Sequence, residues 1–130
     1  MIVADTSAWI DYVRGVKAPH TDILDHELLH GRIVTGDLII TEFLQGFRHR
    51  KEFETAKKMM ERLEYYDMVG MKIALSVAEN YRNLRKSGIT VRKTIDVIIA
   101  TFCVENGFEL IHNDHDFDEM ADALGLRVRR

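Results

Sequence analysis

The sequence has little of several features that define common protein classes. Its 130 residues contain one cysteine and one proline, and no apolar run approaches the roughly 18 residues that a membrane-spanning helix requires. A single cysteine excludes an internal disulfide, and the apolar helical pattern around Cys103 predicts a buried structural thiol. The amino end lacks a basic segment followed by an apolar signal core, so the default expectation is a cytoplasmic protein without membrane contact.

An excess of positive charge is also missing. The formal net charge is -3 at pH 7, which argues against a uniformly basic surface of the kind that coats nucleic acid. With 46% hydrophobic and 30% charged residues, the composition is that of an ordinary globular protein. A chain of this length predicts one domain over residues 1–130.

Apolar segments of strand length alternate with helical patterns along the chain. Because two parallel strands need a crossover of about a dozen residues between them, this alternation predicts a parallel sheet with helices on both faces. The expected strands are residues 1–4, 33–35, 66–69, 109–112 and 126–128. The expected helices are residues 8–12, 19–30, 38–47, 53–63, 73–86, 95–104 and 116–124, with Thr6 or Ser7 able to cap the first and Asp37 the third.

Four acidic residues stand where the sequence is otherwise apolar. Asp5 closes the first strand, and Asp114 follows a later one. Glu42 lies in an apolar helical run, and Asp96 is flanked by isoleucine and valine. An unpartnered carboxylate in such a setting costs several kcal/mol, so a cation or a dense set of hydrogen bonds is expected beside it.

Each of these acids also has a structural explanation. Asp5 would serve as a helix cap, and the stem of Glu42 would pack while its carboxylate reaches water. Asp96 would gain roughly 0.3–1 kcal/mol from a helix dipole, which is less than its burial would cost. Asp116 and Asp118 fit turn and cap roles as well as metal ligation. Ligand crevices in open parallel sheets lie outside the carboxyl ends of the strands, which places Asp5 and Asp114 at one edge.

The sequence also contains a pattern that is typical of zinc proteases. His26, Glu27 and His30 match the H-E-x-x-H pattern, in which two histidines one helical turn apart bind zinc beside a glutamate base. Gly31 ends that helix at once, and the apolar face of the helix leaves both histidines turned away from the core. The zinc-protease hypothesis is therefore disfavoured.

Five ordered motifs carry a resemblance over essentially the whole chain. The sequence resembles the PIN-domain ribonucleases, and specifically the VapC toxins of type II toxin-antitoxin pairs. No single motif is sufficient, but their order is specific. They are Val3 to Ile10, Thr41 to Arg48, Tyr81 to Gly88, Thr94 to Ala100 and Asn113 to Phe117.

The resemblance implies a three-layer α/β/α fold around a small, mostly parallel sheet. It implies catalytic roles for Asp5, Glu42, Asp96 and Asp114, and a Mg²⁺ or Mn²⁺ ion held by Asp5, Asp96, Asp114 and Asp116, with Asp114 and Asp116 as rivals for the last position. Thr6 and Asn113 are expected to hold carboxylates in place. The candidates for RNA backbone contacts are Arg48, Arg82, Arg85, Arg92 and Lys93.

The function that the resemblance implies is that of a metal-dependent endoribonuclease toxin. Attack by water would leave 5'-phosphate and 3'-hydroxyl ends. A homodimer and a cognate VapB antitoxin are the expected partners, with DNA contacted only through the antitoxin. The competing hypothesis is a non-catalytic PIN-like module that binds RNA or a protein.

Overall fold

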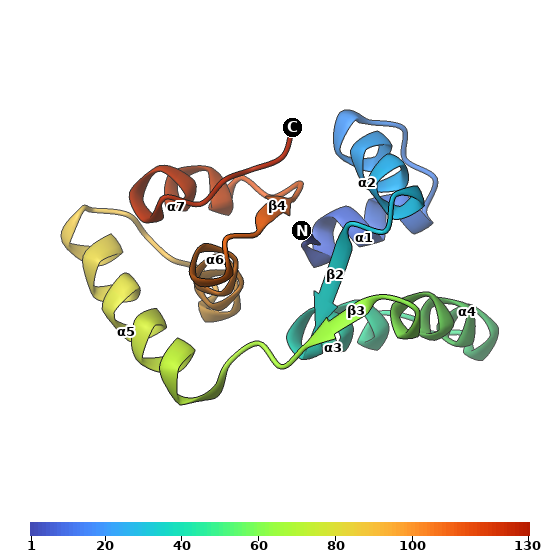
Figure 1. The fold of residues 1–130 in the computed structure, drawn as a ribbon, viewed down its shortest axis with the longest axis horizontal. Coiled ribbons are helices and arrows are strands. Elements are labelled where there is room, and N and C mark those ends of the chain that lie inside the picture. The colour runs from blue at the N-terminus through green and yellow to red at the C-terminus, as the bar shows by residue number, and fades with distance from the viewer.

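A four-stranded sheet lies at the centre of the computed structural model, which describes all of residues 1–130 (Figure 1). All strand pairs are parallel, and the order across the sheet is β3-β2-β1-β4. The strands are β1 (Ile2–Ala4), β2 (Ile33–Gly36), β3 (Glu64–Tyr66) and β4 (Glu109–Ile111).

Seven helices cover the two faces of the sheet. Helices α1 to α4 lie in the two crossovers that lead from β1 to β2 and from β2 to β3, whereas α5 to α7 lie on the opposite side (Figure 1). The expected three-layer α/β/α arrangement is confirmed. The helices are α1 (Thr6–Val13), α2 (Pro19–Leu29), α3 (Asp37–Gln45), α4 (Arg50–Glu61), α5 (Gly70–Lys86), α6 (Thr94–Asn106) and α7 (Asp116–Leu124).

The direction of the chain across the sheet reverses between β1 and β4. Strands β1, β2 and β3 follow one another outward, and β4 then pairs with the other side of β1. Ala4 and Ile111 are register partners, and the Asp5 amide donates a 2.9 Å hydrogen bond to the Ile111 carbonyl. Ligand crevices of parallel sheets form at such a reversal, beyond the carboxyl ends of the strands. The residues that follow β1 and β4 therefore meet there.

The core lies on both sides of the central strands. Val3, Ala4 and Val34 are fully buried, as expected for parallel strands that helices cover on both faces. Trp9 of α1 packs on Phe43 of α3 at a ring-centroid distance of 6.0 Å. Cys103 is buried on α6, as expected, and burial raises the pKa of its thiol. No helix has the length and apolar character needed to cross a membrane.

The third strand differs from its expected position. It spans Glu64–Tyr66 rather than residues 66–69, because the chain leaves the sheet directly after Tyr66. The Met68 amide donates to Asp37 Oδ1 at 3.1 Å, and the Met68 side chain packs over Gly36, where a Cβ would collide with it. A glycine that admits a neighbouring side chain leaves no hydrophobic-pattern signal.

Three further boundaries were predicted wrongly. The expected strand at residues 126–128 is only an isolated bridge between Leu110 and Val128. Asp37 is the first residue of α3 rather than its cap, and its carboxylate holds Leu38 and Met68 amides instead. Helix α1 begins at Thr6 and is capped by Asp5, so neither Thr6 nor Ser7 is the cap.

Candidate functional site

Asp5 combines a capping role with a place in the crevice. Its Oδ2 accepts hydrogen bonds from the Ser7 amide at 3.1 Å and from Ser7 Oγ at 2.8 Å. The residue is 4% exposed, and burial raises the pKa of its carboxyl despite these hydrogen bonds. Asp5 therefore does cap α1, as its structural explanation predicts, and the negative charge of Asp114 also acts on its carboxyl.

Asp96 is the most constrained acid of the site. It lies in the first turn of α6, is 4% exposed, and its Oδ2 has no hydrogen-bond partner although that atom is buried. Burial raises the pKa of Asp96 to about 7, and the negative charges of Asp5 and Asp114 add to the shift. Lys93 opposes it, and Glu42 contributes in the same direction as the other acids. An ionised Asp96 would need a cation.

Asp114 and Asp116 complete a cluster with Asp96. One carboxylate oxygen from each of the three lies within 4.8 Å of the other two. The Asp116 amide donates to Asp114 Oδ1 at 2.9 Å, which fixes the turn between β4 and α7. Both acids are half-buried. The geometry thus brings together both rivals for the last ligand position.

Glu42 reaches the crevice from α3. Its Oε1 accepts a 2.9 Å hydrogen bond from Thr6 Oγ1, and the carboxylate is half-buried. Its negative charge is one of those that raise the pKa of Asp96. Thr6 therefore orients Glu42 across the gap between α1 and α3.

Hydrogen bonds from Asn113 through Ser7 hold the Asp5 carboxylate. The sequence predicted a supporting role for Asn113 but not for Ser7. The Asn113 amide donates to Ser7 Oγ at 2.9 Å, and Ser7 Oγ in turn donates to Asp5. The Asn113 side chain donates instead to Asp11 Oδ2 at 2.8 Å, so Asn113 supports Asp5 only through its backbone amide and Ser7. The signal for Ser7 was its position two residues after an acid, where such local bonds form.

The donor set fits a hard divalent cation. Every ligand on offer is a carboxylate oxygen, and Mg²⁺ and Mn²⁺ prefer oxygen ligands. The buried and unpartnered oxygen of Asp96, with its raised pKa, is the group that a bound cation would satisfy. Asp114 and Asp116 would approach such an ion from the β4–α7 turn.

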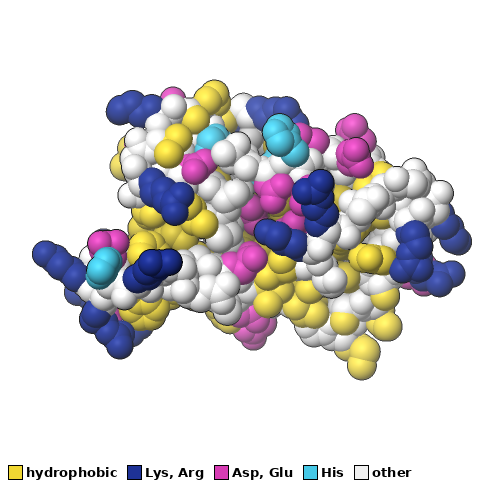
Figure 2. Space-filling model, turned by 180° about the vertical axis from the view of Figure 1, so that it is seen from behind, with side chains coloured by type: hydrophobic (Ala, Val, Ile, Leu, Met, Phe, Trp, Pro, Cys, Tyr) yellow, Lys and Arg dark blue, Asp and Glu magenta, His cyan; other side chains and the backbone are white.

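The basic candidates divide into near and distant groups. Acidic side chains gather at the middle of one face, with Lys and Arg side chains directly beside them (Figure 2). Arg92 Nε lies 4.0 Å from Asp116 Oδ1, and the charge of Lys93 acts on Asp96. Arg82 and Arg85 lie on the exposed surface of α5, and Arg48 lines a separate groove between α1, α3 and α4. None of these last three forms an ion pair with an acid of the site.

The H-E-x-x-H segment does not form a metal site of the protease kind. Glu27 is 1% exposed, and its carboxylate is bound by Arg32 at 3.2 Å and Arg129 at 3.1 Å. These charges lower its pKa, although burial acts in the opposite direction. His30 follows the last residue of α2, and its ring stacks on His26 at the surface. The glutamate is thus a structural anchor rather than a general base.

The strand order β3-β2-β1-β4 and the carboxylates beyond the ends of β1 and β4 define the class of this protein. It is an α/β domain with an acidic site at the carboxyl edge of a parallel sheet. The PIN domain family model matches residues 2–123, and the chain belongs to that family. Two curated relatives are the VapC ribonuclease Mb1587 of Mycobacterium bovis and the ribonuclease VapC11 of Mycobacterium tuberculosis. Each is 29% identical to this chain over 135 residues, covering 98% of the chain and 97% of the relative.

Solved structures share the fold over nearly the full length. VapBC2 from Rickettsia felis, bound to a DNA fragment from its promoter, superposes with a TM-score of 0.79 at 16% identity and covers 99% of this chain and 98% of its own. DNA-bound VapBC from Salmonella typhimurium gives a TM-score of 0.79 at 20% identity, with the same coverage. These likenesses establish the arrangement of strands and helices.

Proposed function

We propose that this chain is a Mg²⁺- or Mn²⁺-dependent endoribonuclease that acts in the cytoplasm as the toxin of a toxin-antitoxin pair. The observation that carries the proposal is the cluster of Asp96, Asp114 and Asp116, in which a buried oxygen of Asp96 has no partner. Membership of the PIN family and the two VapC ribonuclease relatives support the same reaction.

The carboxylates have distinct tasks in this reaction. A bound divalent ion would supply a polarised water and neutralise charge on the phosphate. Asp96 and Asp114 would hold that ion together with Asp116, and Asp5, which caps α1, would assist them. Glu42, oriented by Thr6, accepts a proton from the attacking water. Since water attacks, the products carry 5'-phosphate and 3'-hydroxyl ends.

RNA approaches the site along its basic border. Arg92 and Lys93 directly precede α6 and are exposed, and in this proposal they contact the phosphates on either side of the cleaved bond. Arg82 and Arg85 extend the positive surface along α5, where Arg85 also lies over the Tyr81 ring at 5.1 Å. These contacts position the strand without reading its bases.

A cognate VapB-type antitoxin is the expected protein partner, since the structural neighbours are VapBC complexes. A groove of about 930 Å³ between α1, α3 and α4 suits an amphipathic antitoxin tail that carries acidic residues. Its floor includes Ile10, Phe43 and Met59, and its rim includes Arg48 and Lys51. DNA is contacted through the antitoxin.

A second copy of the chain is the expected self-partner. Met71 and Leu75 are 78% and 61% exposed and lie one turn apart on α5, which gives an apolar stripe for a homodimer. Light scattering of the purified chain tests this assignment. A double substitution to glutamate at the two positions should produce a monomer, and an unchanged mass for the variant would contradict it.

The cleavage experiment uses purified chain, end-labelled RNA and added Mg²⁺ or Mn²⁺. Wild-type protein should cut the RNA, chelator should stop it, and Asp96→Asn and Asp5→Asn should remain folded but inactive. Asp122→Asn, which changes an exposed acid of α7, is the matched control and should cut normally. Unchanged cleavage by both active-site variants, or 2',3'-cyclic phosphate ends, would refute the proposal. RNA binding without cleavage would support the non-catalytic alternative.

A further inference from the structure

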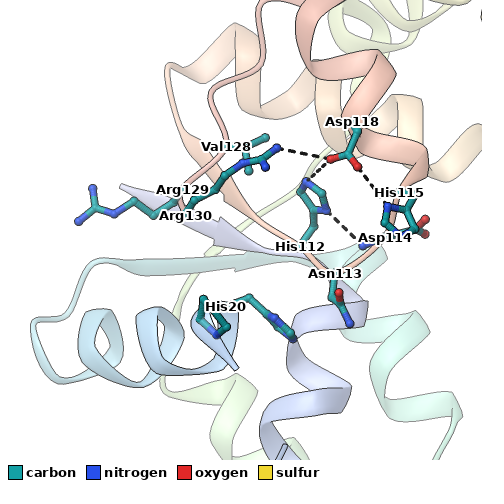
Figure 3. Close-up of a pocket in the computed structure, with 10 residues that line it drawn as sticks. His20, His112, Asn113, Asp114, His115, Asp118, Val128, Arg129 and Arg130 are labelled. Atoms are coloured by element: carbon teal, nitrogen blue, oxygen red, sulfur yellow. Dashed lines mark hydrogen bonds and ion pairs between the residues drawn. The ribbon is translucent and has the colours of Figure 1, made fainter. Parts of the chain in front are cut away.

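A separate pocket of about 390 Å³ opens beside the acidic cluster (Figure 3). It lies between the start of α2, the turn after β4, the first turn of α7 and the C-terminal segment, and Asp114 is the only acid of the metal centre in its wall. Three imidazoles line it, and none of them has a role in the chemistry above. Its polar lining residues of interest are His20, His112, His115, Asp118, Arg129 and Arg130.

His112 presents a buried donor to this pocket. Its side chain is 7% exposed, and its ring packs on Phe117 at a centroid distance of 5.1 Å. Nδ1 accepts the Asp114 amide at 3.2 Å, so that nitrogen is unprotonated and the ring carries its proton on Nε2. Nε2 is buried and has no hydrogen-bond partner. Buried donors without partners are rare and call for a ligand or an ordered water.

Asp118 places an acceptor next to that donor. Its Oδ1 lies 3.8 Å from His112 Nε2, too far for a hydrogen bond, and the two side chains point toward each other in the wall of the pocket (Figure 3). The present partners of the carboxylate are His115 at 3.3 Å and Arg130 at 3.5 Å, both on strongly exposed side chains. Exposed contacts of this kind contribute little, so a ligand can replace them.

The remaining basic side chains of the pocket already have acidic partners. His20 Nε2 bonds Asp11 at 2.7 Å, and Arg129 is shared between Glu27 and Glu109. A free anion therefore finds few unpaired charges here. A neutral ligand that carries an acceptor beside donors matches the walls better.

We propose that the pocket binds a guanine base of the RNA, next to the phosphate that is cleaved; this inference rests on the proposed function. Guanine O6 accepts from His112 Nε2, while its N1–H and exocyclic amine donate to the Asp118 carboxylate. Recognition of single-stranded RNA by the Watson–Crick edges of unstacked bases has this form. The exposed ring of His115 supplies a surface on which the base stacks.

The other bases fit the same walls less well. In uracil, O4 would accept from His112 and N3–H would donate to Asp118. Its O2, however, is an acceptor at the position where guanine presents its amine to Asp118. Adenine and cytosine present a donor toward His112 and an acceptor toward Asp118, which reverses the required pattern. Loss of a hydrogen bond to a buried or charged group is worth about a tenfold change in binding.

The pocket adjoins the site of chemistry through one shared residue. Asp114 lines the pocket, and its carboxylate also lies within 4.8 Å of those of Asp96 and Asp116. A base held by His112 and Asp118 therefore belongs to a nucleotide adjacent to the cleaved bond, and it fixes which bond reaches the acids.

The first test maps cut sites in random-sequence RNA for wild-type protein, Asp118→Asn and Asp122→Asn. Wild type and Asp122→Asn should favour guanine at one fixed position beside the cut. In Asp118→Asn that preference should fall by about tenfold while cleavage continues, because the amide offers one acceptor instead of two. Cut sites without a guanine preference, or a preference that Asp118→Asn retains, would overturn the inference.

The second test does not depend on cleavage. In chelator, nuclear magnetic resonance signals of the His112 ring are followed while GMP, AMP, CMP or UMP is added; the shared phosphate makes the base the only variable. GMP should bind about tenfold more tightly than the others, and Asp118→Asn should remove the difference. Equal binding of all four would overturn the guanine site whether or not the chain cuts RNA.

The two tests together separate the possible failures. GMP binding without a guanine preference at cut sites would assign the pocket to a free guanine nucleotide and overturn its role in RNA recognition. Absence of all cleavage would refute the proposed function, and the nucleotide titration would still decide whether the pocket selects guanine.

Discussion

Thr6 Oγ1 and Glu42 Oε1 are joined by a 2.9 Å hydrogen bond that links the first residue of α1 to α3. The two residues are 36 positions apart in the sequence, and the bond is part-buried. The Glu42 carboxylate accepts no other hydrogen bond from the chain, so Thr6 is the one residue that restricts its orientation by hydrogen bonding. Thr6 is therefore a positioning residue for the acid assigned to the attacking water.

Replacement of Thr6 by valine should slow RNA cleavage by about 10- to 100-fold, the usual cost of removing a partner that orients an active-site ligand. Valine keeps the shape of threonine but cannot donate to Glu42. The effect should fall on kcat, with KM for RNA nearly unchanged. Thr41→Val is the matched control, because its hydroxyl bonds only the Asp37 carbonyl of its own helix. Equal rates for the two variants would refute the positioning role.

Asp96→Asn should separate function from stability. Cleavage should fall by more than about 100-fold, beyond the effect of a supporting residue. The metal-free variant should nevertheless be more stable than wild type at pH 8, by up to about 4 kcal/mol, since the charge that burial and the neighbouring acids disfavour is gone. Thermal unfolding in chelator measures this gain. Asp122→Asn should change neither quantity, and a metal-free Asp96→Asn less stable than wild type would contradict the account.

The pH dependence of stability follows from the same carboxyl. Its pKa is about 7 in the folded chain, against an ordinary 3.8, so the folded state binds the proton more tightly. The resulting stabilisation is present in full below about pH 3.8 and is lost as pH rises through 7. In chelator, the stability of Asp96→Asn relative to wild type should therefore grow between pH 5.5 and 8, by at most about 1.4 kcal/mol per unit. Urea unfolding measures it.

Added Mg²⁺ provides the control for that measurement. An ion held by Asp96 keeps its carboxylate ionised, so it should stabilise wild type increasingly as pH rises and leave Asp96→Asn almost unaffected. If, in chelator, wild type and Asp96→Asn differ in stability by the same amount at pH 5.5 and pH 8, Asp96 has an ordinary pKa.

The parts of the site that the sequence predicted are those that topology determines. Asp5 and Asp114 each follow a strand, and the ends of parallel strands share an edge, so their proximity required only the sheet. The close approach of Met68 to Gly36, which displaces β3, depends on side-chain packing and leaves no periodic signal. The burial of His112 likewise depends on Phe117, five residues along, and on a backbone amide. Hydrophobic patterns do not encode such contacts.

Glu27→Gln should lower stability without affecting cleavage. The buried carboxylate holds Arg32 and Arg129, and both arginines are partly exposed, so water compensates some of the loss. We expect a cost of about 1–3 kcal/mol, the range for a lost hydrogen bond to a charged group. Glu79→Gln, at an exposed position of α5, is the control and should be neutral. Loss of cleavage in folded Glu27→Gln would contradict the purely structural role of Glu27 and would support a catalytic role for the H-E-x-x-H segment.

Arg92→Gln should weaken RNA binding without altering the chemical step. Arg92 is 78% exposed, and its guanidinium lies 4.0 Å from Asp116, so its structural role is small. If it contacts one phosphate, KM for RNA should rise several-fold at constant kcat. The slope of log affinity against log salt concentration should fall by about 0.7, the value for one contact to a single strand. Lys72→Gln, on the exposed surface of α5, should keep the wild-type slope. A fall in kcat with an unchanged salt slope would instead mean that Arg92 acts through Asp116.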